Sequence, residues 1–164
     1  MSSYKSMPLD GNGFPMDAGS YWGNSVEKII TFAGGTTNAI GDYDGTGDPF
    51  SIFTVTGDVL VKIYGVCTTD LVGGATIEVG IAGNTAALLP QVADATSIDA
   101  GEIWHMTDAT VDSGVEAASV LIEKMVVNGA DIIGSIGTAN ITAGVIKFVC
   151  VWYPLSEGAS VEAA

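Results

Sequence analysis

The chain has 164 residues, of which 48% are apolar, and its 19 acidic side chains are set against five lysines and no arginine. This length predicts one domain with a substantial core, and the apolar content excludes disorder of most of the chain. A net charge of −14 argues against binding to a nucleic-acid backbone or to an anionic membrane, because both need clustered cations.

Residues 1–26 predict an extended, irregular N-terminal arm. The segment is rich in Gly, Ser, Pro, Asp and Asn, and neither a strand nor a helix periodicity runs through it. Its aromatic side chains are candidate anchors on a partner surface, and packing on the chain's own body is the alternative. These partner-binding candidates are Tyr4, Phe14, Tyr21 and Trp22. The segment has no apolar core of signal-peptide type, so we expect synthesis and retention in the cytoplasm.

The body, residues 27–164, predicts an all-β fold, an antiparallel β-sandwich of jelly-roll type. A first strand is expected at 28–33, and strands at 50–55, 59–67 and 76–82 are separated by short glycine-containing turns. Both alternating sets of residues in 59–67 are mostly apolar. We therefore expect both faces of this strand to be covered, by a second sheet or by a neighbouring subunit.

Short strands at 85–89 and 91–93 are expected around Pro90, and another at 98–106 with a bend at Gly101. Apolar runs at 120–127 and 130–136 flank Asn128-Gly129, which predicts a β-hairpin with a type I′ turn. A short helix over 118–126 is the alternative.

The last long strand is expected at 144–153, with two separate faces. One face carries Val145, Lys147, Val149, Val151 and Tyr153, and the other carries Ile146, Phe148, Cys150 and Trp152.

The sequence shows few groups suited to catalysis, so we expect no enzyme. The one histidine, His105, would need Asp99 or Glu102 to orient it as a general base, and no nucleophile motif accompanies it. The favoured interpretation is a packed histidine beside Trp104. The two cysteines at positions 67 and 150 predict buried thiols, with a disulfide as the alternative.

Asp42, Asp44 and Asp48 form the one acidic constellation, in the run DYDGTGD. Carboxylates at this spacing are typical calcium ligands, but the EF-hand pattern fails because its twelfth position is Phe53 rather than Glu. We favour a turn between two strands, with calcium at a subunit contact as the alternative, and expect no cofactor.

Two strings resemble small structural proteins encoded by tailed bacteriophages and prophages: FTVTGDVLVKI at 53–63 and CTTDLVGGATIEVGIAGNTAALL at 67–89. The shorter pieces DAGEIWH at 99–105, NGADIIG at 128–134 and TANITAG at 138–144 are similar to the same group. The resemblance covers residues 28–154. It implies a non-enzymatic virion protein, a capsid decoration (cement) protein that sits on the capsid surface and binds the major capsid protein.

Symmetry favours closed oligomers, and for a decoration protein we expect a homotrimer on local threefold axes of the capsid. Other virion parts stay open as alternatives, namely a head-fibre base, a tail tube or a baseplate component. A carbohydrate-binding jelly-roll module is a further alternative, with Trp104 or Trp152 as stacking platforms and the acidic run holding calcium.

Overall fold

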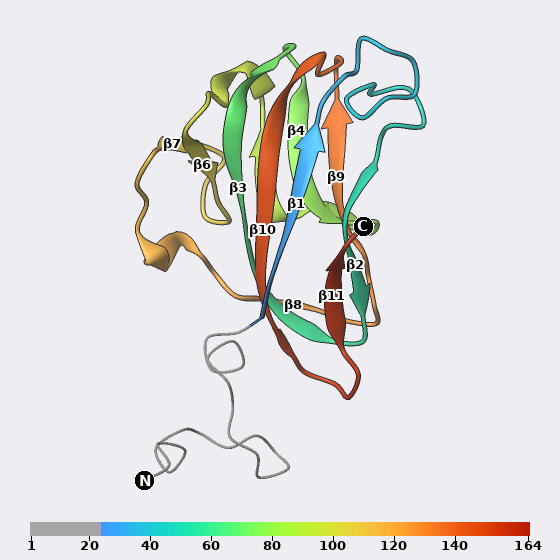
Figure 1. Cartoon of the computed structure of the whole chain (residues 1–164), viewed down its shortest axis with the longest axis vertical. Coiled ribbons are helices and arrows are strands. Elements are labelled where there is room, and N and C mark those ends of the chain that lie inside the picture. The colour runs from blue at the N-terminus through green and yellow to red at the C-terminus, as the bar shows by residue number, and fades with distance from the viewer. Residues whose placement is uncertain (1–23) are drawn as a thin grey trace, which may run out of the picture.

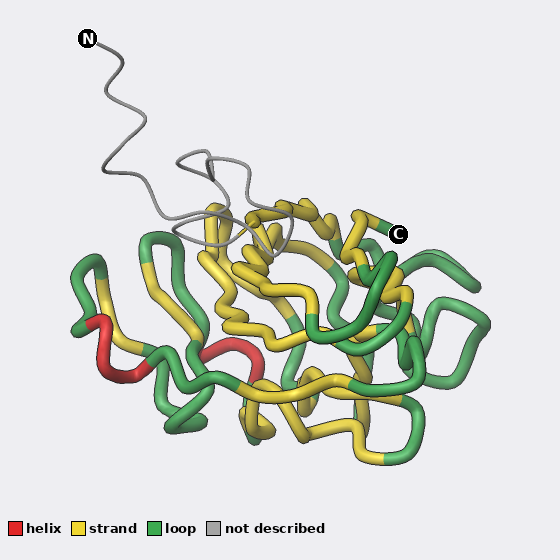
Figure 2. Tube along the Cα trace, turned by 90° about the horizontal axis from the view of Figure 1, so that it is seen from below, coloured by secondary structure: helices red, strands yellow, loops and turns green. Residues whose placement is uncertain are grey.

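The computed structural model describes residues 24–164, which form two antiparallel sheets packed face to face (Figure 1). The first sheet contains β1 (Asn24–Thr31), β3 (Val59–Val72), β6 (Glu102–Trp104), β7 (Asp112–Ser113), β8 (Lys124–Val126) and β10 (Ala143–Pro154). The second contains β2 (Phe50–Thr56), β4 (Thr76–Ile81), β5 (Asn84–Val92), β9 (Ile132–Gly137) and β11 (Ser160–Ala163). Two 3-10 turns complete the body, η2 (Ala95–Ser97) and η3 (Ala118–Val120) (Figure 2).

The order of the first sheet is β1-β10-β3-β6-β7, with β8 also paired to β3, and the order of the second is β11-β2-β9-β4-β5. This arrangement confirms the predicted all-β sandwich. No helix in the described residues has the length and apolar character needed to cross a membrane.

The core lies between the two sheets and is built by residues that alternate along most of each strand, with an irregularity in β2 that buries both Ile52 and Phe53. On β10, Ile146, Phe148 and Cys150 point inward and are fully buried. The second sheet contributes Ile52, Phe53, Ile77 and Val79 to the core, and each of them is also fully buried. Burying one such side chain contributes about 1.5–3 kcal/mol. Trp104 of β6 packs its ring against Phe148, with 6.3 Å between ring centroids.

Several predicted strand bounds were wrong. β1 begins at Asn24, because Asn24 and Val26 pair with Trp152 and Cys150 of β10, so the predicted arm loses its last three residues to the sheet. The strand predicted at 98–106 shrinks to the three residues of β6, because Gly101 has a φ of 95° and turns the chain.

The pieces predicted at 85–89 and 91–93 are one strand, β5, which tolerates Pro90 because it lies at the edge of its sheet. The outer side of this edge is partly occupied. The Nε1–H of Trp104 donates to the carbonyl of Pro90 at 3.2 Å, and Lys124 Nζ donates to the carbonyl of Ala87 at 2.8 Å. Both donors belong to the opposite sheet.

The turn at Asn128-Gly129 has the predicted backbone but joins different partners. Both residues have positive φ, 58° and 63°, as a type I′ turn requires. The flanking strands nevertheless do not pair, because β8 binds β3 in the first sheet while β9 lies between β2 and β4 in the second. The predicted hairpin is therefore a crossing between sheets. Asp58 holds it by accepting the amide of Asn128 at 2.8 Å. The alternative helix over 118–126 is reduced to η3.

The long loop between β1 and β2 is held to the body by close backbone approach at Gly34. Its amide donates to the carbonyl of Ile141 at 2.9 Å, and the amide of Ile141 donates to Gly41 at the same distance. A Cβ built on Gly34 would lie 2.1 Å from the carbonyl oxygen of Gly41. Its neighbour Gly35 has room, since the nearest atom to a Cβ there is 3.9 Å away on Thr142.

We expect Gly34→Ala to lower the free energy of unfolding by about 1–3 kcal/mol, because two backbone segments must move apart. Gly35→Ala is the matched control and should leave stability within about 0.5 kcal/mol of the wild type. Urea unfolding followed by circular dichroism measures both. Equal stability of the two variants would contradict the close approach.

Candidate functional site

The outward side of the first sheet is mainly apolar over the two adjacent strands β10 and β3, with Ile29 of β1 on one side and Met125 of β8 on the other. In β10 the outward residues include Val149 and Tyr153, which pair with Tyr64 and Leu60 of β3. We call this surface the outer face. It consists of Ile29 from β1, Val145, Lys147, Val149, Val151 and Tyr153 from β10, Leu60, Lys62, Tyr64 and Val66 from β3, and Met125 from β8.

The prediction that both faces of residues 59–67 are covered is confirmed for the inward face. The inward set of β3, which includes Val61 and Ile63, is fully buried against the second sheet, as expected. The outward set is only half-buried. At the two ends of the face, Ile29 is 63% exposed and Met125 is 71% exposed. No described segment crosses in front of β1 and β10 in Figure 1.

The segment 105–123 crosses beside β3 and β6 and closes one side of the outer face. Between this segment and the sheet lies a pocket of about 200 Å³. Its lining comes from both sides and consists of Tyr64, Ile103, Glu116, Ala117, Ala118, Val120 and Leu121. Lys62 fastens the end of the segment through an ion pair with Glu123 at 3.0 Å.

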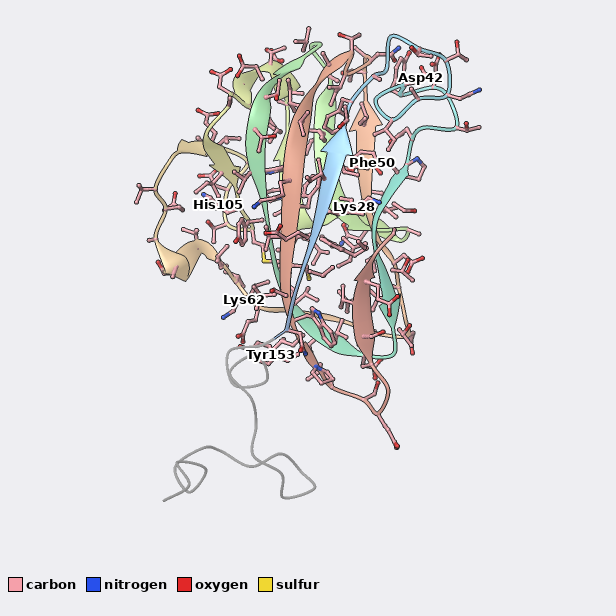
Figure 3. All side chains as sticks on the ribbon, viewed as in Figure 1. Lys28, Asp42, Phe50, Lys62, His105 and Tyr153 are labelled. Atoms are coloured by element: carbon pink, nitrogen blue, oxygen red, sulfur yellow. The ribbon has the colours of Figure 1, made fainter. Side chains whose placement is uncertain are left out.

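His105 fastens the start of the same segment. It is 2% exposed and lies beside β6 (Figure 3). Its Nδ1 lies 2.9 Å from the hydroxyl of Thr107, and its Nε2 lies 3.6 Å from a carboxylate oxygen of Glu116. Of the two acids considered as orienting groups, Glu102 instead accepts the amide of Asp99. The geometry gives His105 a role in holding the segment, consistent with the packed histidine expected beside the buried Trp104.

The three acidic candidates for calcium do not converge. Asp42 is 6% exposed and accepts the amide of Asn38 at 2.7 Å. Asp48 accepts the amide of Ile136 at 2.7 Å, and burial raises its pKa against that hydrogen bond. Asp44 is exposed. No group of three metal-ligating side chains occurs within residues 24–164. The loop consists of turns and bends between β1 and β2, as the favoured interpretation predicted, and calcium at a subunit contact stays a prediction.

We expect Asp42→Ala to lower the free energy of unfolding by about 1–3 kcal/mol, because it leaves the amide of Asn38 without its acceptor. Asp44→Ala is the matched control and should have little effect, since its side chain is exposed. Melting temperatures of wild type and both variants, each with calcium and with a chelator, give the measurement. A wild-type melting temperature that rises with calcium would contradict the assignment of the loop as a turn.

The two cysteines are buried and free, as the favoured interpretation predicted. Both point into the core from neighbouring strands, where Cys67 pairs with Ile146 and Cys150 with Ile63. Burial raises the pKa of the Cys67 thiol to about 11 and that of Cys150 to about 12.

We expect neither thiol to react with a disulfide reagent at pH 8, because only the thiolate attacks and a raised pKa keeps its fraction small. Both thiols should react at once in denaturant, where burial is lost. A thiol titration of native and unfolded protein measures this difference. A native thiol that reacts at the rate of a free cysteine would contradict its burial.

The other predicted site residues have different outcomes. Tyr4, Phe14, Tyr21 and Trp22 lie outside the described residues, so their role as anchors stays a prediction. Trp104 is 1% exposed and cannot stack on a sugar. Trp152 is half-buried and packs against the core cluster. The carbohydrate-binding alternative therefore loses Trp104 as a stacking platform, and its other elements stay predictions.

No family model, curated protein or solved structure matches the chain. The sequence did not reveal that Glu116 and Glu123 make the contacts that hold segment 105–123 in place. Lys62 lies on β3, far from Glu123 in sequence, and His105 lies several turns of chain before Glu116, so no local spacing connects either pair.

Proposed function

We propose that this chain is a non-enzymatic structural protein of a tailed-phage virion, a decoration protein that binds and stabilises the shell of major capsid protein. The observation that carries the proposal is the outer face, an apolar sheet surface on a rigid sandwich. Exposed apolar patches of this kind often mark sites of association with another protein. The strings that resemble phage structural proteins form β3, β4 and most of β2 and β5, which lie in both sheets.

The mechanical demands on a decoration protein fit this body. A shell under internal pressure needs a bridge that does not deform, and paired strands with a close-packed core resist deformation. It needs no reacting groups. The ionisable side chains that lie close together in the described residues make contacts within the chain, such as His105 with Glu116 and Lys62 with Glu123. A net charge of −14 keeps many copies dissolved before assembly.

The proposal assigns shell binding to the N-terminal segment. Residues 1–23 precede β1, which is an edge strand of its sheet. A segment of this length reaches at most about 75 Å when extended, far enough to touch more than one shell subunit. Its four aromatic residues, Tyr4, Phe14, Tyr21 and Trp22, are the proposed anchors.

We expect deletion of residues 1–23 to abolish co-sedimentation with capsids while leaving the circular dichroism spectrum and melting temperature of the body unchanged. The deletion ends before Asn24 because β1 begins there. Capsids of the phage or prophage that encodes the chain, assembled without it, are the binding target. A full-length control with the four aromatic residues changed to Ala tests the anchors at constant length, and binding by the deleted protein would overturn the role of the segment.

Localisation in intact particles tests the function itself. Antibody labelling or cryo-electron microscopy should place the protein on the capsid surface, in many copies per particle. Rings or filaments of purified protein, or label confined to the tail, would overturn the decoration assignment in favour of a tail component.

A further inference from the structure

We propose that the pocket between the first sheet and segment 105–123 binds a basic side chain, lysine or arginine, of a partner protein. The pocket lies beside β3 and β6, at the side of the sheet away from β1. Which protein supplies the side chain rests on the proposed function, under which it is the major capsid protein. The site itself is argued from the size, the lining and the charge of the pocket.

The size of the pocket suits one side chain. Pockets that enclose a drug-sized ligand have volumes of about 300–1,000 Å³. The volume here, about 200 Å³, is smaller than that range but far larger than the roughly 15 Å³ that one water molecule needs. A group of a few heavy atoms on a stem, such as an amino-acid side chain, has the matching size. Ala117 and Ala118 of the lining are exposed, so a side chain can enter from the surface.

The lining combines apolar walls with one carboxylate. Aliphatic surface comes from Ile103 of β6 and from Val120 and Leu121 of the segment. Tyr64 of β3 adds an aromatic ring, and Glu116 is the one charged residue among the described lining residues. Lysine and arginine bury an apolar stem against such walls while their cationic head stays near water. The head is attracted both by a carboxylate and by the face of an aromatic ring.

The carboxylate of Glu116 has capacity for a cation. One oxygen accepts the amide of Ala117 at 2.6 Å, and the other lies 3.6 Å from Nε2 of His105, which is longer than a hydrogen bond. A carboxylate has about four acceptor sites, so each oxygen has room for another donor. The side chain of Glu116 is only 21% exposed, and this partial burial strengthens its attraction for a cation.

The described lysines of the chain are engaged elsewhere, each with a carboxylate or a backbone carbonyl. They are Lys28, Lys62, Lys124 and Lys147. The sequence contains no arginine. We therefore assign the cation to a partner protein. The net charge of −14 favours the approach of a basic surface.

Binding of a capped amino acid to the full-length protein tests the site. The probe is N-acetylarginine N-methylamide, followed by two-dimensional ¹H–¹⁵N NMR. A fragment of this size is expected to bind with a Kd of about 1–10 mM, so the titration extends to about 30 mM. We expect the amide signals of Tyr64, Ala117 and Ala118 to shift, since these residues line the pocket. Capped citrulline has nearly the same shape without the charge and should bind about fivefold more weakly.

Three variants separate the pocket from the general attraction of an acidic protein for cations. Glu116→Gln keeps an acceptor oxygen beside His105 and should weaken binding of the arginine probe about fivefold. Ala118→Phe adds bulk at an exposed lining position and should weaken both probes. Glu162→Gln removes the same charge from an exposed position on β11 and should leave the affinity unchanged. Circular dichroism and the melting temperature of each variant show whether the fold is retained.

A further probe separates a protein side chain from a free amine. Putrescine offers ammonium groups on an alkyl stem with no peptide backbone. We expect it to bind no more tightly than the capped arginine. Tighter binding of putrescine at the same amide signals would overturn the assignment of the site to a partner protein.

Other results would also overturn the inference. They are the absence of shifts at the pocket in the full-length protein, equal affinities for the arginine and citrulline probes, or undiminished binding by Glu116→Gln. A protein that is found on capsids but whose pocket takes no probe would sink only this inference. A pocket that binds as expected, in a protein absent from particles, would sink only the proposed function.

Discussion

The antiparallel pairing of β10 with β3 is the interaction on which the rest of the structure depends. The register runs from Ala143 opposite Val72 to Pro154 opposite Val59, which makes it the longest pairing in the described chain. Every other strand of the first sheet except β7 pairs directly with one of these two. Their inward residues form the floor of the core, and their outward residues form the outer face. Because the two strands are about 80 residues apart in sequence, this organising contact is non-local, a feature that slows folding.

The outer face and segment 105–123 are two consequences of the same pairing. Within residues 24–164 the outward apolar set on β3 is covered on one side only, where the contacts of His105 with Glu116 and of Lys62 with Glu123 hold segment 105–123 in place. No described segment crosses in front of β1 and β10 (Figure 1). The two sheets thus enclose a complete core, while the outward side of the first sheet keeps exposed apolar side chains. This combination suits a protein whose work is to associate rather than to react.

Composition and periodicity were sufficient to predict the fold class and the faces of the long strands. Alternation in 144–153 assigned Ile146, Phe148 and Cys150 to one side, and all three are core residues. Pairing was harder to predict. Asn128-Gly129 correctly predicted a turn with positive φ, because a turn depends on only four residues. The strand that pairs with β8 could not be predicted in the same way, because β3 lies more than 60 residues away in sequence. The same limit applies to the candidate calcium ligands. The spacing of Asp42 and Asp48 could not show that their carboxylates accept hydrogen bonds from the amides of Asn38 and Ile136.

The occupied edge of β5 bears on how copies of this chain can join. Trp104 and Lys124 reach from the first sheet to carbonyls of β5, and Lys28 of β1 reaches the C-terminal residue beyond β11. These contacts disfavour the addition of a foreign strand, which is the route by which sheet proteins grow into fibrils. Contact through a face has a natural end, because a face that is covered offers nothing to the next molecule. A protein that associates through a face rather than through a strand edge therefore forms units of finite size instead of open polymers.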